Sequence, residues 1–206
     1  MGSAEQTSEG PERIASSATV EAGAAIGPGT SVWDLAHVRQ GATVGIGCVV
    51  GRGVFIDHDV VVGDHCKIQN NALIYAPAVL GPGVFVGPAA VITNDRIPRA
   101  VLPDGRRKVS DDWSPVGVVV DEGASIGAGA VVIGGVHVGS WSLVAAGAVV
   151  EREVPSFALV AGVPARFVHW VGRAGLALQD EGEDGWLCPS TGRRYREENG
   201  GLRESP

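Results

Sequence analysis

Residues 44–92, VGIGCVVGRGVFIDHDVVVGDHCKIQNNALIYAPAVLGPGVFVGPAAVI, place a small aliphatic side chain at every sixth position. The residue two positions earlier is usually small or β-branched, and glycine or another turn former often follows. A period of six fits neither an ordinary helix nor a flat strand, so it predicts a chain that turns a corner every six residues. We call these aliphatic positions the six-residue beat; they are Ile14, Val20, Ile26, Val32, Val38, Val44, Val50, Ile56, Val62, Ile68, Ile74, Leu80, Val86, Ile92, Val120, Ile126, Val132, Val138, Val144 and Val150.

Each six-residue unit reads as a short strand followed by a turn. Two inward residues flank one outward residue, and the next three positions form the corner. Three units would close a triangular coil, and stacked coils would pair their strands in parallel at roughly 4.8 Å per coil. The 31 glycines and the 5% aromatic content suit tight corners around a narrow core. A β-sandwich is the alternative, and the unbroken step disfavours it.

From about residue 14 to residue 170 this pattern resembles the hexapeptide-repeat family, whose fold is a left-handed parallel β-helix. The left hand is implied by the resemblance alone. The general rule for parallel crossovers would predict a right-handed coil. We therefore expect an all-β chain of stacked coils, 18 residues each, with an ejected loop and a short C-terminal helix.

The interruptions of the beat divide the chain into parts. Residues 1–13 are polar and are expected to form a disordered lead-in, and residues 14–155 the β-helix. The loop at 93–117 is rich in charges and proline, which favours a lid or a subunit-interface arm over a solvated insertion. Residues 156–174 read as a capping turn and helix, from the spacing of Phe167, Val168 and Val171. Residues 175–206 form a polar tail with a hairpin around Trp186–Tyr195.

The bulk composition limits the partners. A net charge of −7 without a basic stripe argues against nucleic acid. The sequence has no apolar run long enough for a membrane span or a signal-peptide core. Three cysteines give no even disulfide framework, so a reduced, cytoplasmic setting is expected, with Cys48 and Cys66 as packing residues. Neither Cys188 nor the five scattered histidines suit a metal within one subunit, although zinc across subunits stays an alternative.

Three segments carry a closer resemblance: CKIQNNALIY (66–75), GVFVGPAAVITNDRIPRA (83–100) and GVPARFVHWVG (162–172). They are similar to nucleotide-sugar N-acetyltransferases that act on UDP-2-acetamido-3-amino-2,3-dideoxyglucuronate or on dTDP-3-amino-3,6-dideoxyhexoses. The resemblance implies acetyl-CoA as the donor, a homotrimer, and active sites in the grooves between neighbouring prisms.

The same resemblance suggests the acceptor site. It places Asn71 beside the sugar amine, which an amide can orient but cannot deprotonate. His58 is the first candidate general base and His65 the second, with an exposed turn histidine as the alternative for each. Because residues 18 apart share a column, His58 and Asn94 should lie two coils apart, leaving a gap of roughly 10 Å for part of a ligand. The expected substrate-binding residues are Gln69, Asn70, Tyr75, Asn94, Asp95 and Arg99.

Two readings of these corners remain open. Asn70 and Asn71 can instead serve a tight left-handed turn. The turn after Ile74 is Tyr-Ala-Pro, where a polar or acidic residue would serve a sugar better, so the sugar is not identified.

The later coils are expected to bind the cofactor. The small corners at 127–129 and 145–147 would let pantetheine lie against the backbone at Ala128, Ala145 and Ala146. Arg166 could meet the CoA phosphates, with Arg152 and Arg173 as weaker candidates. Backbone N–H groups at such corners can stabilise the oxyanion of acyl transfer.

The sequence thus favours an acyl-CoA-dependent N-acyltransferase that acetylates an amino sugar attached to a nucleotide. The alternatives are an acyltransferase for another small amine or hydroxyl acceptor, and a zinc-dependent or non-catalytic hexapeptide-repeat protein.

Overall fold

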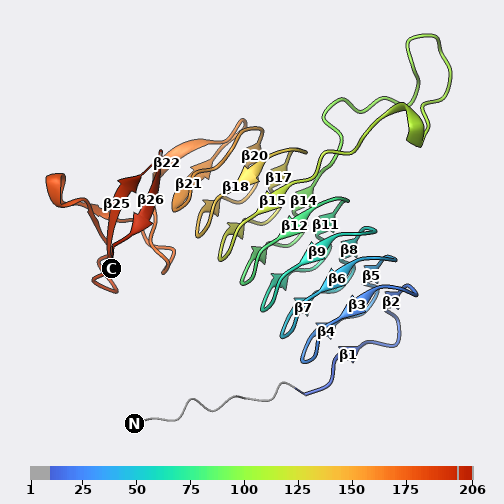
Figure 1. Cartoon of the computed structure of the whole chain (residues 1–206), viewed down its shortest axis with the longest axis horizontal. Coiled ribbons are helices and arrows are strands. Elements are labelled where there is room, and N and C mark those ends of the chain that lie inside the picture. Colours follow the sequence, from blue (N-terminus) through green and yellow to red (C-terminus); the bar gives the residue numbers. More distant parts are fainter. Residues whose placement is uncertain (1–9, 199, 206) are drawn as a thin grey trace.

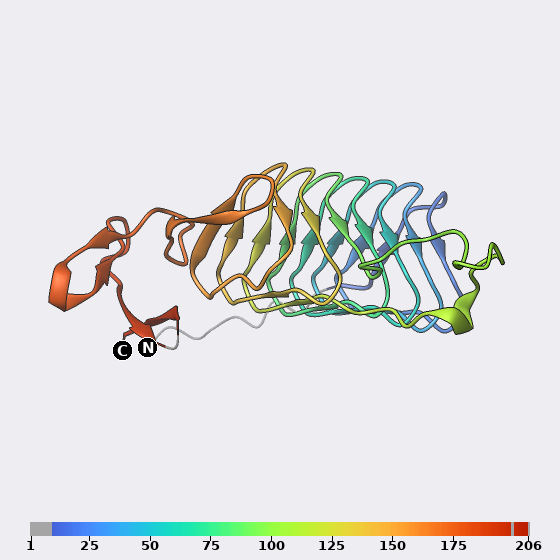
Figure 2. The same ribbon diagram turned by 90° about the horizontal axis from the view of Figure 1, so that it is seen from above.

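The computed structural model describes residues 10–198 and 200–205. The chain winds into a three-sided prism of stacked coils, from which one long loop and a C-terminal tail project (Figures 1 and 2). Most strands of the prism are two residues long, because a corner of four residues separates each strand from the next. We call the three sides face A, face B and face C, and the corners between them the A–B, B–C and C–A edges.

Each face is a parallel sheet in which every strand pairs with the strand of the next coil. Face A contains β1 (Arg13–Ile14), β4 (Ser31–Val32), β7 (Val49–Val50), β10 (Lys67–Ile68), β13 (Phe85–Val86), β16 (Ser125–Ile126), β19 (Leu143–Val144), β21 (Ala158–Ala161) and, antiparallel at its end, β22 (Arg166–Trp170). Face B contains β2 (Thr19–Val20), β5 (His37–Val38), β8 (Phe55–Ile56), β11 (Leu73–Ile74), β14 (Val91–Ile92), β17 (Val131–Val132) and β20 (Val149–Val150). Face C contains β3 (Ala25–Ile26), β6 (Thr43–Val44), β9 (Val61–Val62), β12 (Val79–Leu80), β15 (Val119–Val120) and β18 (His137–Val138).

The six-residue beat is the core of the prism, as predicted. The second residue of each strand points inward, and Val38, Ile56, Ile74 and Ile92 are fully buried along face B alone. The first residue of each two-residue strand points outward and is half-buried or exposed. Burial of these aliphatic columns, at about 25 cal/mol per Å² of apolar surface, is the main stabilising term of the prism.

The ejected loop leaves after β14, at the B–C edge, and returns before β15. It does not disturb the stacking, because Val79 pairs with Val61 before the loop and with Val119 after it. The loop contains the short 3-10 helix η1 (Ser110–Asp112) and projects away from the coils (Figure 1).

The predicted C-terminal helix is wrong. Residues 158–170 form the antiparallel pair β21–β22, which extends face A beyond β19. Gly162, at a φ of 96°, turns the chain back so that β22 pairs with β21. The open strand edge at the end of the prism prevails over the helical spacing of Phe167, Val168 and Val171, because an unpaired edge offers the chain ready hydrogen-bond partners.

The tail forms a small antiparallel sheet with its own apolar cluster. Its elements are β23 (Gln179–Asp180), η2 (Gly182–Asp184), β24 (Trp186–Leu187), β25 (Arg194–Glu198) and β26 (Gly201–Glu204). The expected hairpin is present, with Trp186 opposite Tyr195. Tyr195 packs against Phe157 of the prism, with ring centroids 5.0 Å apart, and so joins the tail to the last coil. Of the predicted lead-in, residues 1–9 lie outside the described residues, whereas Arg13 already pairs in β1.

A column of small polar side chains lies inside the C–A edge. The Thr30 hydroxyl donates to the carbonyl of Gly45 (2.7 Å), and the thiols of Cys48 and Cys66 donate to the carbonyls of Gly63 and Gly81 (3.2 Å each). The packing role expected for the two cysteines agrees with these contacts. Ser142 continues the column, but its buried hydroxyl has no partner among the described residues.

We therefore predict that Ser142→Ala raises the free energy of unfolding by about 1 kcal/mol, since an unpaired buried hydroxyl is costly. Ala124 and Ala158 occupy this position in the adjacent coils, so alanine fits the site. Thr30→Val is the matched control and should lower that free energy by a similar amount, because the Thr30 oxygen also accepts from the Cys48 N–H. Urea denaturation measures both; destabilisation by Ser142→Ala would contradict the prediction.

Candidate functional site

The A–B edge carries the polar corner that follows β10. Asn71 has a φ of 60°, a left-handed conformation that asparagine tolerates, and its N–H donates to the carbonyl of Arg52 at 2.9 Å. Its side chain is exposed and makes no hydrogen bond to another described residue. Backbone geometry therefore fixes the position of Asn71 and leaves its amide group available to a ligand.

Its neighbour Asn70 has a different role. The Oδ1 atom of Asn70 accepts a hydrogen bond from the Arg52 N–H at 3.0 Å, which ties one coil to the next. Asp64 makes the same contact with the Ile46 N–H at the C–A edge, at 2.9 Å. The turn-stabilising interpretation thus describes Asn70 well, although its amide nitrogen can still reach a ligand.

Small corners continue the A–B edge above Asn71. Backbone hydrogen bonds join Ala89 to Asn70, Gly129 to Pro88 and Gly147 to Ala128, all at 2.8–2.9 Å. Ala128, Gly129, Ala146 and Gly147 are exposed, and no heavy atom lies within 4 Å of a methyl group built on Gly129 or Gly147. We call the exposed corners from Asn70–Asn71 through Ala128–Gly129 to Ala146–Gly147 the A–B track. It brings Gln69, Asn70, Asn71, Ala128, Ala145 and Ala146 together on one edge.

The other predicted acceptor residues lie at the B–C edge, across face B from Asn71. His58 is half exposed, and its Nδ1 lies 3.0 Å from the Asp59 carboxylate. Asn94 occupies the His58 column as predicted, but its Nδ2 donates to the carbonyl of Ala76 at 2.6 Å. The Ala76 corner lies between His58 and Asn94 in this column, and the ligand gap expected there stays a prediction.

The ejected loop uses the remaining predicted residues for its own structure. Asp95 accepts from the Ile97 N–H and pairs with Lys108 at 3.2 Å. Lys108 also lies over the Trp113 ring, 5.2 Å from its centroid. Arg99 is exposed and donates a hydrogen bond to the carbonyl of Pro98. Ile97, which is 73% exposed, lies on this projecting arm.

A buried carboxylate at the B–C edge is absent from the sequence prediction. Asp57 accepts hydrogen bonds from Arg39 (2.7 Å) and from the N–H groups of His58 (2.8 Å) and Ala76 (3.3 Å). Burial alone would raise the pKa of Asp57, but these donors outweigh it and hold the pKa below its ordinary value. Asp57 thus fixes the corner that carries His58 and Tyr75.

We predict that Asp57→Asn lowers the free energy of unfolding by about 2 kcal/mol at neutral pH, since it breaks the ion pair with Arg39. The folded-state pKa is depressed, so this contribution is present above the unfolded value of about 4 and is lost as the pH falls through the folded value. Urea midpoints of the two proteins should therefore converge in acid. Asp64→Asn is the control, because Asn70 already makes the equivalent contact; a pH-independent difference for Asp57→Asn would contradict the assignment.

A second unpredicted group lies on the outer side of face B. The Nε2 atom of His37 is 2.7 Å from a carboxylate oxygen of Glu21. The N–H of Gln40 and the His37 ring both lower the pKa of Glu21. The His37 ring contacts Phe55, and Phe55 contacts Tyr75, at centroid distances of 5.7 and 5.6 Å. His37 and Phe55 are 18 residues apart, so the coil length alone predicts that these two outward side chains are neighbours.

The arginines expected at the cofactor lie at the end of the prism. Arg166 starts β22, 3.5 Å from Glu151, and lines a cavity of about 150 Å³ with Arg152 and Phe167. Arg173 instead lies 4.5 Å over the Trp141 ring and pairs with Glu204 at 2.6 Å, so it fastens the tail to the prism. All three arginines are exposed, and Arg152 also lies beside Glu151.

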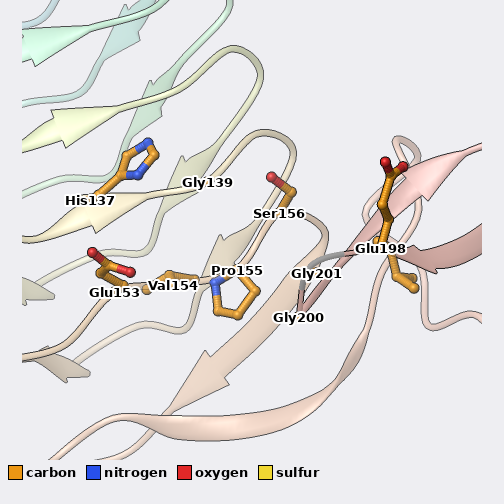
Figure 3. Close-up of a pocket in the computed structure, with 10 residues that line it drawn as sticks. His137, Gly139, Glu153, Val154, Pro155, Ser156, Glu198, Gly200 and Gly201 are labelled. Atoms are coloured by element: carbon orange, nitrogen blue, oxygen red, sulfur yellow. The ribbon is translucent and has the colours of Figure 1, made fainter.

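A larger cavity of about 340 Å³ lies where the tail meets the prism (Figure 3). His137 and Glu153 form one side, and Glu198, Gly200 and Gly201 form the other. His137 is already held by Asp121 at 2.8 Å. The predicted site residues do not line this cavity, which lies several coils away from Asn71. Within the described part of the chain, no group of three His, Cys, Asp or Glu side chains is arranged to hold a metal ion.

Part of the chain is similar in sequence to known proteins. Residues 59–94 match the family model of the bacterial transferase hexapeptide (six repeats). A serine acetyltransferase of Haemophilus influenzae is 44% identical over 87 residues, which are 42% of this chain and 32% of that enzyme. The chain thus spans about a third of the length of that relative.

Two solved structures are also similar. A hexapeptide-repeat acetyltransferase of Vibrio cholerae, complexed with acetyl-CoA, is 28% identical with a TM-score of 0.51, covering 61% of this chain and 68% of the other. LpxA of Bacteroides fragilis, a UDP-N-acetylglucosamine acyltransferase, is 16% identical with a TM-score of 0.63, covering 78% of this chain and 61% of that one, and shows the fold alone. The Bacteroides fragilis structure thus confirms the left-handed parallel β-helix, whereas the matched family model and the Vibrio cholerae structure confirm the resemblance to hexapeptide-repeat acyltransferases. Among the described residues, no helix is long and apolar enough to cross a membrane.

Proposed function

We propose that the protein is an acetyl-CoA-dependent N-acetyltransferase that acts on the amino group of a nucleotide-linked sugar. The observation that carries the proposal is the A–B track, which joins one exposed, unbonded amide at Asn71 to a line of small, open corners. A thioester laid along the corners would end at the amide, where an amine can be held.

The donor is supported by the shape of the track and by the Vibrio cholerae relative, which was crystallised with acetyl-CoA. Ala128, Ala145 and Ala146 would let the pantetheine arm lie against backbone amides, and Arg166 would face its phosphates. The three coil steps between the Asn70 and Ala146 corners amount to about 14 Å, so donor and acceptor would meet end to end.

The reaction needs little chemistry from side chains. The amine nitrogen attacks the thioester carbonyl, the carbon–sulfur bond breaks, and the CoA thiolate leaves with the electron pair. Corner N–H groups would stabilise the oxyanion, and Asn71 would orient the attacking amine. Within one subunit His58 lies across face B from Asn71. The His58 that accepts the amine proton would therefore belong to a neighbouring subunit.

A trimer belongs to the same proposal. The outward residues Val61, Val79 and Val119 form an exposed apolar column on face C, each more than 40% exposed, beside the edge from which the loop projects. Packing of this column and of the arm residue Ile97 against neighbouring prisms would bury both surfaces. Each active site would then combine the A–B track of one subunit with the B–C edge of another.

Serine acetylation is the second candidate, because the Haemophilus relative carries that name. A hydroxyl acceptor requires a stronger base than an amine does, and His58 is the candidate for that base. The two functions differ in their acceptors, so one assay separates them.

The test is CoA release measured with a panel of UDP- and dTDP-linked amino sugars, the matching free amino sugars, and serine. Turnover with a nucleotide-linked amino sugar supports the proposal. Turnover confined to serine would replace it with the second candidate, and absence of turnover with every amine in the panel would refute it.

A further inference from the structure

Three rings form a continuous group on face B, in the coils that lead up to Asn71. His37, Phe55 and Leu73 are successive outward residues of the paired strands β5, β8 and β11. Tyr75 follows Leu73 at the end of β11, and its ring reaches back to Phe55. All three rings are half-buried, so each keeps an exposed part on the surface of the prism.

The charges beside these rings neutralise one another. Arg39 pairs with Asp57 at 2.7 Å and lies 3.7 Å from Glu21. Glu21 in turn holds His37, so the charged side chains described at the rim of the ring group are paired with one another. Such a surface suits a flat, uncharged heteroaromatic ring, because aromatic side chains stack on its face while the imidazole and carboxylate meet its polar edge. It does not suit a phosphate, which needs a free positive charge.

The position of the group relative to Asn71 is equally specific. Asn71 precedes Leu73 by two residues and Tyr75 follows it by two, so β11 separates them by at most about 13 Å. The A–B track extends from Asn71 toward the C-terminal coils, whereas the rings extend toward the N-terminal coils. A ligand held at Asn71 can therefore contact both.

We propose that His37, Phe55 and Tyr75 bind the nucleobase of the acceptor. The inference rests on the proposed function and adds an order along the prism axis: base, then amine, then thioester. Glu21 acts as a positioning residue, because it holds His37 through Nε2 and leaves Nδ1 to face the ligand.

The rival occupant is a neighbouring subunit, since the outward column of face B after Phe55 is aliphatic at Leu73, Val91, Val131 and Val149. That part of face B suits a protein contact. The ring group differs from it by the His37–Glu21 pair, which a dry interface would leave poorly solvated.

The test is calorimetric binding of UDP, dTDP and inorganic pyrophosphate to the wild type, to Phe55→Leu and to Tyr75→Leu. Stacking is worth about 1–3 kcal/mol per base, so each variant should weaken nucleotide binding by about 5- to 150-fold without changing the affinity for pyrophosphate. Phe85→Leu is the matched control, an outward aromatic of β13 on face A, and should bind nucleotide as the wild type does.

The possible results separate this inference from the proposed function, because nucleotide binding requires no turnover. Ring-dependent nucleotide binding without acetyl transfer would keep the subsite and refute the acetyltransferase. Acetyl transfer with the same KM for free and nucleotide-linked amino sugars would keep the acetyltransferase and refute the subsite. The subsite also fails if neither nucleotide binds the wild type. It fails likewise if Phe55→Leu changes the mass of the oligomer, measured by light scattering, and leaves nucleotide affinity intact.

Discussion

Replacement of Asn71 by glycine is expected to lower kcat/KM for the amine acceptor by about 10- to 100-fold, the range of one hydrogen bond to a polar or charged group. Glycine is chosen over alanine because Asn71 has a φ of 60°, which glycine adopts without strain. The substitution therefore removes the amide and keeps the corner. Steady-state kinetics at varied acceptor concentration measures the effect.

The control for this variant is Leu35→Gly, which lies in the same column of the A–B edge. Leu35 also has a left-handed φ, of 59°, and is 56% exposed. Its replacement should leave kcat/KM unchanged, and both variants should unfold within about 0.5 kcal/mol of the wild type. Equal kinetics for Asn71→Gly and the wild type would remove Asn71 from the site.

The second large effect is expected from a side chain that obstructs the A–B track. Ala146→Leu should lower kcat/KM for acetyl-CoA by about 100-fold, because displacing the thioester by even 1 Å has effects of that size. Ala146 is exposed, so the larger side chain meets solvent and not the core, and stability should be preserved. The affinity for the acceptor, measured without donor, should also be preserved.

Ser16→Leu tests whether the effect is local to the track. Ser16 is an exposed residue of the same edge, in the first coil, at the position that Asn70 and Ala146 occupy in later coils. It should have wild-type kinetics. If Ser16→Leu and Ala146→Leu were equally impaired, the defect would lie in the fold and not in the donor site.

The prism was predictable because a single physical constraint repeats in it. Each inward aliphatic must meet the one a coil below, so the phase of Ile56 determines those of Ile74 and Ile92. The C-terminal strands were not predictable in this way. Their residues pair with an edge left by β19, and that edge exists only once the coils have stacked.

The candidate site was predictable in part for a related reason. The resemblance of Gln69–Asn71 identified one corner, and the step of 18 residues aligned His58 with Asn94. The step could not relate Asn71 to Ala128 or Ala146, because the ejected loop interrupts the phase and only the observed pairing of Phe85 with Ser125 restores it. Nor could it show that Asn94 donates to Ala76, or that Glu21 holds His37, since both are side-chain contacts.

Because the strands pair in register across the ejected loop, the coils keep a constant spacing along the whole prism. Distances along its axis come in whole coils of about 4.8 Å, because a strand is either paired or not. The gap between an amide corner and a donor corner can therefore change only in these increments, by gain or loss of complete turns of the chain. The loop, by contrast, can lengthen freely, since Val79 meets Val119 whatever lies between them. If the proposed function holds, acceptor selection can be altered residue by residue at the edges, while the spacing of donor and acceptor changes only in whole coils.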